Sequence, residues 1–241
     1  MNTRADIIEC LAALRARPEK YPLAPSTQDL IRNARAALTS LTDDGRFLTE
    51  LLESECEALG GSGDLLVCAV LRGAIGKRKY PEAVPMLNRM LTDPRFEAMH
   101  EDLAEMLGQM GDSSSVPSLI GALSSKEVWV RAKAAESLGR LADSRAIPSL
   151  IVLLHDDSDS VRENAIQALA EMVATQASEP LLRIAVSPEE TGYIRSEAIK
   201  SLGRMGIGEA VPLLRKLRQT EKDEDVQKAA ADALAILDKS T

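Results

Sequence analysis

The chain has 241 residues, of which 45% are hydrophobic, so it is long enough and apolar enough to bury a core. Only 2% of the residues are aromatic, so small and aliphatic side chains must fill that core, which favours closely packed helices over sheets. The formal net charge of −8 argues against nucleic acid as the main ligand, because a phosphate backbone requires a basic surface.

Targeting segments and metal sites are not expected from the sequence. Arg4, Asp6 and Glu9 interrupt the N-terminus, and no apolar run reaches membrane-spanning length. The two histidines, His100 and His155, are far in sequence from the three cysteines, which contain no CxxC pair. We therefore expect a cytoplasmic protein with reduced cysteines, no membrane segment, no metal and no cofactor.

The first 45 residues predict two amphipathic helices. The first covers residues 6–17 and places four apolar side chains on one face: Ile7, Ile8, Leu11 and Leu14. The second extends to about Leu41, with Ser26 or Thr27 as its capping residue, after an extended connector that contains Pro22 and Pro25. We predict that residues 1–45 form an N-terminal cap, which covers the apolar face of the next element.

Residues 46–76 predict a pair of helices separated by the glycine-rich stretch 60–64. The second of these helices fits the pattern of the repeats described below at four positions: Val67, Leu71, Ile75 and Gly76. The sequence therefore predicts that a repeat array covers residues 46–241 and forms a single continuous domain with the cap.

One pattern recurs along the rest of the chain. Each copy has a proline near the start of a short apolar helix, an acidic turn, and a longer second helix. The prolines are Pro85, Pro117, Pro148, Pro180 and Pro212, at spacings of 32, 31, 32 and 32 residues. The first core position of each second helix is apolar: Met99, Val130, Val161, Ile194 and Val226. A fixed period in this range indicates stacked helical hairpins.

Other positions of the repeat have structural explanations. Gly139 and Gly203 interrupt helical sequence, which costs about 1 kcal/mol each relative to alanine unless a neighbouring repeat packs closely there. The arginines that follow the first core positions lie beside acidic turns, so they predict a ladder of ion pairs between repeats rather than an anion site: Arg131, Arg162 and Arg195. The turn at residues 189–192 has an extra residue, and we expect it to bulge toward a partner.

The repeats resemble a known family. Val130-Arg131, Ala134 and Leu138-Gly139-Arg140 recur as Ile194-Arg195, Ala198 and Leu202-Gly203-Arg204, and this pattern is similar to the HEAT-like repeats named after phycobilisome lyases. The resemblance covers residues 65–241 well and residues 46–64 weakly. It implies an all-α fold, a right-handed superhelical α-solenoid of HEAT-like helical hairpins. Members include bilin lyase subunits, phycobilisome-degradation factors and bacterial scaffolds.

Second helices line the concave surface of HEAT-type arrays, so their free side is the candidate binding surface. A helical projection places positions two, three, six and nine after each first core position on that side. The candidate residues for binding a partner are Glu101, Asp102, Glu105, Trp129, Glu136, Glu163, Gln167 and Lys200. Five of them form what we call the acidic stripe: Glu101, Asp102, Glu105, Glu136 and Glu163.

Two interpretations of this surface remain open. The acidic stripe is either a solvated helix face or a docking surface for a basic protein. Trp129 either packs between repeats or anchors a partner. No nucleophile–base pair can be assembled from the sequence, so enzymatic activity is without support.

The sequence therefore predicts a non-enzymatic protein–protein interaction module that binds a basic partner protein, as a scaffold, assembly factor or immunity-type inhibitor does. The alternative, implied by the resemblance, is a bilin lyase subunit or phycobilisome-degradation factor. The sequence leaves open the identity of the partner, any bound bilin, the oligomeric state and the pathway.

Overall fold

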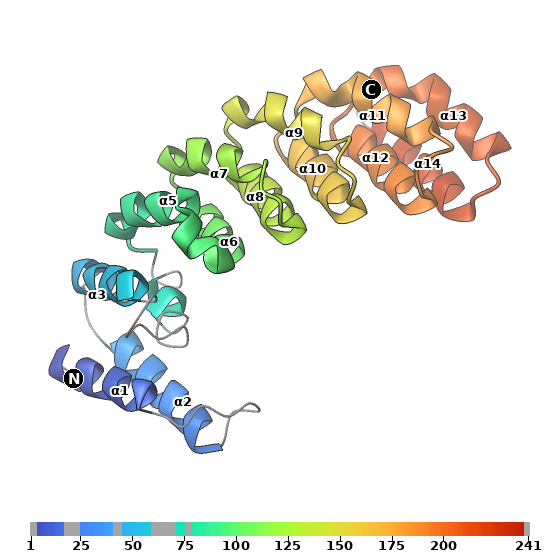
Figure 1. Cartoon of the computed structure of the whole chain (residues 1–241). Helices are drawn as coiled ribbons and strands as arrows, with labels where there is room; N and C mark the ends of the chain where they lie inside the picture. The colour runs from blue at the N-terminus through green and yellow to red at the C-terminus, as the bar shows by residue number, and fades with distance from the viewer. Residues whose placement is uncertain (1–3, 17–24, 41–44, 59–70, 76–78, 239–241) are drawn as a thin grey trace. The chain divides into compact units, whose positions relative to one another are not determined.

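A computed structural model describes residues 4–16, 25–40, 45–58, 71–75 and 79–238. Every regular element in these ranges is a helix, so the predicted all-α repeat fold is confirmed (Figure 1). The chain divides into two compact units, residues 1–96 and 97–241. Among the described helices, none combines the length and the apolar character needed to cross a membrane.

The first unit contains α1 (Arg4–Arg15), α2 (Pro25–Ser40), α3 (Gly45–Glu57), the 3-10 helix η2 (Pro81–Ala83) and α5 (Val84–Thr92). Helix α1 packs on α2 and buries Ile7, Leu11 and Leu14. Ile8, which was expected on the same face, is 50% exposed because it lies on the side of α1 next to the buried stripe. Helix α2 begins at Pro25 rather than after it, since the fixed backbone angle of proline suits the first turn of a helix.

The predicted helix pair at residues 46–76 is described only in part. Helix α3 buries Leu48 and Leu52, and the short helical stretch 71–75 buries Leu71 and Ile75. Val67, Gly76 and the glycine-rich stretch 60–64 lie outside the described residues. The start of the array at residue 46 and its continuity with the cap therefore stay predictions.

The second unit consists of helical hairpins that follow α6 (His100–Met110). The hairpins are α7 (Val116–Ala122) with α8 (Val128–Leu141), α9 (Ile147–Leu153) with α10 (Asp159–Glu171), α11 (Ser178–Val186) with α12 (Gly192–Arg204), and α13 (Val211–Thr220) with α14 (Glu224–Leu237). We call α6, α8, α10, α12 and α14 the second helices, and α7, α9, α11 and α13 the first helices. Proline lies at the start of α7, α9 and α13, as the sequence predicts.

The second helices form one continuous layer, in which each packs on the next (Figure 1). Each first helix packs mainly on the second helix of its own hairpin. The first core positions of α8, α10, α12 and α14 are buried: Val130, Val161, Ile194 and Val226. The leucines eight residues further along each helix are buried as well: Leu138, Leu169, Leu202 and Leu234. Burial of an aliphatic side chain of this size contributes about 1.5–3 kcal/mol, so this repeated core is the main source of stability.

The two helical glycines lie where neighbouring second helices approach most closely. A Cβ atom added at Gly139 would lie 2.8 Å from the Cα atom of Ala168, and one added at Gly203 would lie 2.8 Å from the Cβ atom of Ala233. This confirms the packing explanation for both glycines. It also corrects the helical projection, because the ninth position after the first core position faces the next second helix, and not solvent, at Gly108, Gly139 and Gly203.

Candidate partner-binding surface

A ladder of ion pairs joins the turns of successive repeats. Arg131 donates to both carboxylate oxygens of Asp156 at 2.7 and 2.8 Å, and to the backbone oxygen of Ser125 at 2.9 Å. Arg162 pairs with Glu190 in the next turn, and Arg195 pairs with Glu221. The predicted ladder is thus confirmed, and each of these guanidinium groups already binds a carboxylate.

The contacts of the ladder shift the pKa values of Asp156, Arg131 and Glu221. The hydrogen bonds from Arg131 hold the pKa of the Asp156 carboxyl below its usual value, and the same contact raises the pKa of Arg131. The bond from Arg195 likewise lowers the pKa of Glu221. All three arginine side chains are largely buried, so the ladder is a structural element of the turns.

The turn before α12 differs from its prediction. The connections 123–127, 154–158 and 187–191 have equal lengths, and the extra residue is taken up by α11, which is longer than α7 and α9. Glu190 lies in this turn and pairs with Arg162 at 2.9 Å. The expected bulge toward a partner is therefore wrong, because the turn is held in the ladder.

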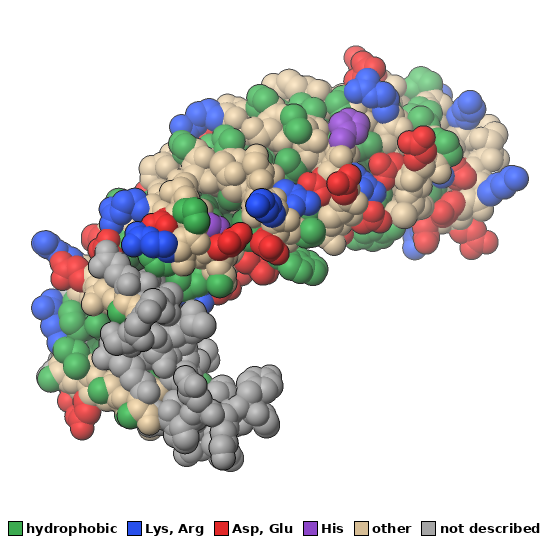
Figure 2. Space-filling model, in the orientation of Figure 1, with side chains coloured by type: hydrophobic (Ala, Val, Ile, Leu, Met, Phe, Trp, Pro, Cys, Tyr) green, Lys and Arg blue, Asp and Glu red, His purple; other side chains and the backbone are tan. Residues whose placement is uncertain are grey.

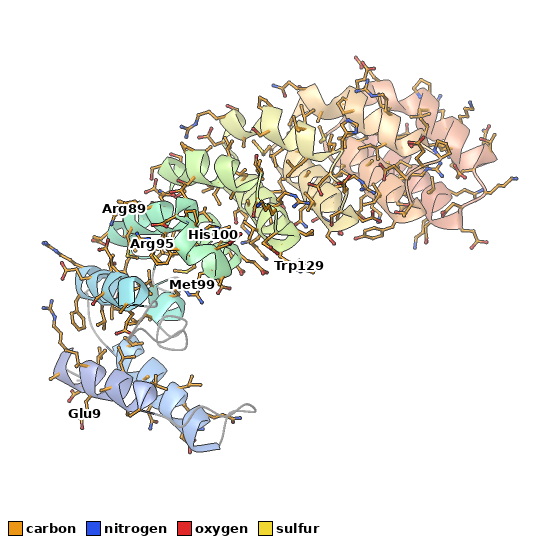
Figure 3. All side chains as sticks on the ribbon, in the orientation of Figure 1. Glu9, Arg89, Arg95, Met99, His100 and Trp129 are labelled. Atoms are coloured by element: carbon orange, nitrogen blue, oxygen red, sulfur yellow. The ribbon has the colours of Figure 1, made fainter. Side chains whose placement is uncertain are left out.

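The side of the second helices that faces away from the first helices carries all the candidate residues, and we call it the open face. Glu101, Asp102, Trp129 and Lys200 are exposed there, and Glu105, Glu136, Glu163 and Gln167 are half-buried. Trp129 is 62% exposed and projects from the N-terminal end of α8 (Figure 3). Its side chain is thus available to a partner, rather than packed between repeats.

Not every position on the projected surface is accessible. Ala132, Ser196 and Ala229 occupy positions two or three after a first core position, yet all three are buried. The reason is geometric: each second helix from α8 onward packs on its own first helix and on at least one neighbouring second helix, and the interior ones have such neighbours on two sides, so little of the circumference stays open.

The carboxylates of the acidic stripe have different partners. Glu136 accepts hydrogen bonds from Lys133 at 2.8 Å and from Arg140, so its charge is compensated within α8. The bond to Glu136 also raises the pKa of Lys133. Glu101 and Glu105 of α6 form no such ion pair with a described residue, so the stripe carries more negative charge at α6 than at α8. Figure 2 shows acidic side chains gathered over α6 and along the edge formed by the second helices.

Tyr193 is a second aromatic residue of the open face that the sequence analysis missed. It is 53% exposed and immediately precedes the core residue Ile194, as Trp129 precedes Val130. Its hydroxyl donates to Glu163 of the preceding second helix, and this bond raises the pKa of Tyr193 to about 12. The shared position relative to the core was the signal that could have revealed it. Trp129 and Glu101 occupy the positions equivalent to this hydrogen-bonded pair in two earlier successive repeats.

The open face carries exposed aromatic rings beside carboxylates. In the described part of the chain, no group of three or more His, Cys, Asp or Glu side chains is arranged to hold a metal ion. Two exposed aromatic rings and neighbouring carboxylates are suited to contacts with Arg and Lys side chains, through cation–π and charge-assisted hydrogen bonds.

Stacked hairpins with one layer of second helices define a helical-repeat array. The family model of HEAT repeats matches the sequence at residues 98–170 and 150–235, which together make up more than half of the chain. The chain belongs to the HEAT-repeat family, whose arrays generally bind other proteins, and the resemblance seen in the sequence is confirmed.

Solved structures share this fold. YibA of Escherichia coli has a TM-score of 0.59 and 13% identity, over 98% of this chain and 82% of that chain. The complex of CpcE and CpcF of phycocyanin lyase from Nostoc sp. PCC7120 has a TM-score of 0.55 and 21% identity, over 92% and 82%. An engineered protein has a TM-score of 0.52 and 22% identity, over 87% and 96%. Such identities establish the fold alone. No curated protein matches the chain.

Proposed function

We propose that the chain is a non-enzymatic protein-interaction module whose open face binds a basic partner protein. The observation that carries this proposal is Trp129, a large aromatic side chain that is 62% exposed beside a helix rich in carboxylates. Exposed Trp and Tyr side chains are enriched at the centres of protein interfaces, because they bury a large area at a low cost in conformational entropy.

Charge supports a basic partner. Glu101 has no hydrogen bond or ion pair to another described residue, and Glu105 accepts one bond only, from Gln109 at 3.1 Å. A chain with a formal net charge of −8 attracts a positively charged protein over a distance set by the ionic strength. An arginine of that partner would then stack on Trp129 and donate to the carboxylates of α6.

The biological setting is proposed from the fold. A scaffold, an assembly factor and an immunity-type inhibitor all use such a surface, and the proposal places the protein in the cytoplasm, where free thiols such as Cys10 persist. The alternative function, a bilin lyase subunit or phycobilisome-degradation factor, has the CpcE–CpcF fold as its support. A change in bilin absorbance on mixing the protein with bilin and apoprotein would favour that alternative.

The test is the association rate with a partner recovered by affinity purification of the full chain. Reversing two charges on α6, Glu101→Lys with Glu105→Lys, should slow association about tenfold at low salt, because electrostatic steering contributes 10-fold or more to such rates. The effect should shrink above physiological ionic strength, where the screening length falls below about 8 Å.

A matched control reverses two charges on the other side of the unit. Glu179 and Glu209 are exposed on α11 and on the 3-10 helix η7 (Gly208–Ala210). Glu179→Lys with Glu209→Lys changes the net charge by the same amount and should leave association nearly unchanged. Equal effects of the two double variants would show that only the net charge matters, and the open face would lose its assignment.

A further inference from the structure

A groove lies between α12 and α14 on the open face, at the C-terminal end of the array. It has a volume of about 340 Å³ and is lined from α12 by Tyr193, Ser196 and Lys200. Helix α14 contributes Asp225, Lys228 and Asp232. These residues occupy equivalent positions of two successive repeats, so the groove follows the direction of the helices and is open to an extended chain.

The floor of the groove contains a buried hydroxyl group without a partner. Ser196 is 3% exposed, and its Oγ atom has no hydrogen-bond partner. By contrast, the buried Ser137 of α8 donates to the backbone oxygen of Ala104 at 2.8 Å. Ser115 also lacks a partner, but it lies before α7, outside this groove. A buried polar group left unpaired is unfavourable, so Ser196 points to a ligand that pairs with it.

The charges along the groove alternate. Lys228 is exposed and forms no hydrogen bond or ion pair to a described residue. Lys200 pairs only with Glu197 of its own helix, at 2.9 Å and half exposed, and such surface pairs contribute little. Asp225 and Asp232 lie one turn on either side of Lys228 along α14. Along α14 a positive charge therefore lies between two negative charges, and Lys200 adds a second ammonium group on the facing helix, at the position equivalent to Asp232.

We propose that this groove binds a segment of the partner protein in which one acidic side chain is flanked by basic residues, an inference that rests on the proposed function. The carboxylate accepts hydrogen bonds from the Ser196 hydroxyl and from the ammonium groups of Lys200 and Lys228. The flanking basic side chains bind Asp225 and Asp232.

The dimensions fit an extended segment. Asp225 and Asp232 are seven residues apart, which corresponds to about 10 Å along a helix that rises about 1.5 Å per residue. An extended chain covers that distance in about three residues at about 3.3 Å each. Basic residues two positions before and after the acidic residue therefore reach both ends, because their side chains are long and flexible. A single negative charge suits the site better than a phosphate dianion, since Asp225 and Asp232 line the groove and Glu197 already pairs with Lys200.

The test uses three blocked, fluorescently labelled peptides of the pattern Arg-Gly-X-Gly-Arg, where X is Glu, Gln or phosphoserine. Fluorescence anisotropy with the full chain measures their dissociation constants. The Glu peptide should bind about fivefold or more tightly than the Gln peptide, as expected for a charge-assisted hydrogen bond, and no more weakly than the phosphoserine peptide. Absence of saturable binding, equal binding of the Glu and Gln peptides, or a clear preference for phosphoserine would overturn the proposal.

Three variants assign the effect to the groove. Lys228→Gln should bring the Glu-to-Gln ratio close to one, whereas Lys216→Gln, at an exposed lysine of α13, should leave it unchanged. Ser196→Ala should weaken binding of the Glu peptide and yet raise the Tm, because it removes an unpaired buried hydroxyl. Lower affinity together with lower stability would indicate a merely structural serine. If the peptides do not discriminate while partner association still depends on Glu101 and Glu105, the groove proposal fails and the proposed function stands.

Discussion

At the scale of single residues, the arginine that follows each first core position links one repeat to the next. Arg131 binds the carboxylate of Asp156 in the turn of the following hairpin and the backbone oxygen of Ser125 in the turn of its own hairpin, so it ties the two turns together. Arg162 and Arg195 do the same one and two repeats later. Because both partners of the first pair are nearly buried, solvent screens it less than an ordinary surface ion pair.

Asp156→Asn should lower the free energy of unfolding by about 1.5–3 kcal/mol at neutral pH, the net value of a hydrogen bond to a charged group. The pKa of Asp156 is lower in the folded chain than the ordinary value of 3.8. Its contribution is therefore present above that value and is lost as the pH falls through the lowered folded-state pKa. Urea unfolding at pH 7 and pH 3 measures this, and the gap between variant and parent should narrow at pH 3. A gap that widens in acid would contradict the assignment.

At the scale of helices, small residues set the spacing of the second-helix layer. Gly108, Gly139 and Gly203 occupy equivalent positions, and an added Cβ atom at any of them would lie closer than 3.0 Å to the next helix. The neighbouring atoms include the backbone of Ser137, Ala168 and Ala233, which cannot move without shifting a whole helix. Close packing therefore outweighs the poor helix propensity of glycine at these positions.

Gly139→Ala should cost about 1–3 kcal/mol through overpacking, even though alanine favours a helix by about 1 kcal/mol. Gly121 of α7 offers a matched control, because an added Cβ atom would have no neighbour within 4 Å. Gly121→Ala should be neutral or stabilising by up to about 1 kcal/mol. Thermal unfolding of both variants decides the matter. Equal stability of the two would show that the helix layer can relax around the extra methyl group.

The repeat fold could be predicted from the sequence because each hairpin buries side chains at the same positions of its helices. The period of the prolines and of residues such as Val130 and Val161 reports the same buried positions several times, so errors at one position are corrected by the others. The arginine ladder could be predicted for the same reason. The resemblance to a repeat family added the name of the fold, and the family match confirmed it.

The binding surface could be predicted only in part. Whether Glu136 carries a free charge depends on the rotamers of Lys133 and Arg140, which a helical projection does not contain. The projection also assumes one buried side per helix, so it placed Gly139 in solvent and overlooked the burial of Ser196. Features that occur once, such as an unpaired hydroxyl, have no periodic signal in the sequence.

At the scale of the whole array, stability should be distributed unevenly along the second unit. Helix α10 packs on α8 and on α12, whereas α14 has a second-helix neighbour on one side only, α12. In a repeat array each hairpin is stabilised mainly by its nearest neighbours, so a terminal hairpin opens more easily than a central one. Backbone amides of α14 should therefore exchange with solvent faster than those of α10.

Leu169→Ala tests this distribution from within the array. Leu169 is fully buried in α10, and its truncation should cost about 2–5 kcal/mol through lost burial and a residual cavity. Hydrogen exchange should accelerate most in α8, α10 and α12, and less in α14, because the loss reaches distant hairpins only through their neighbours. Val152→Ala, at a 69% exposed position of α9, is the control and should leave exchange nearly unchanged. A uniform acceleration across residues 97–238 would instead show that the second unit opens as one cooperative body, and the open face would then be rigid over its full length.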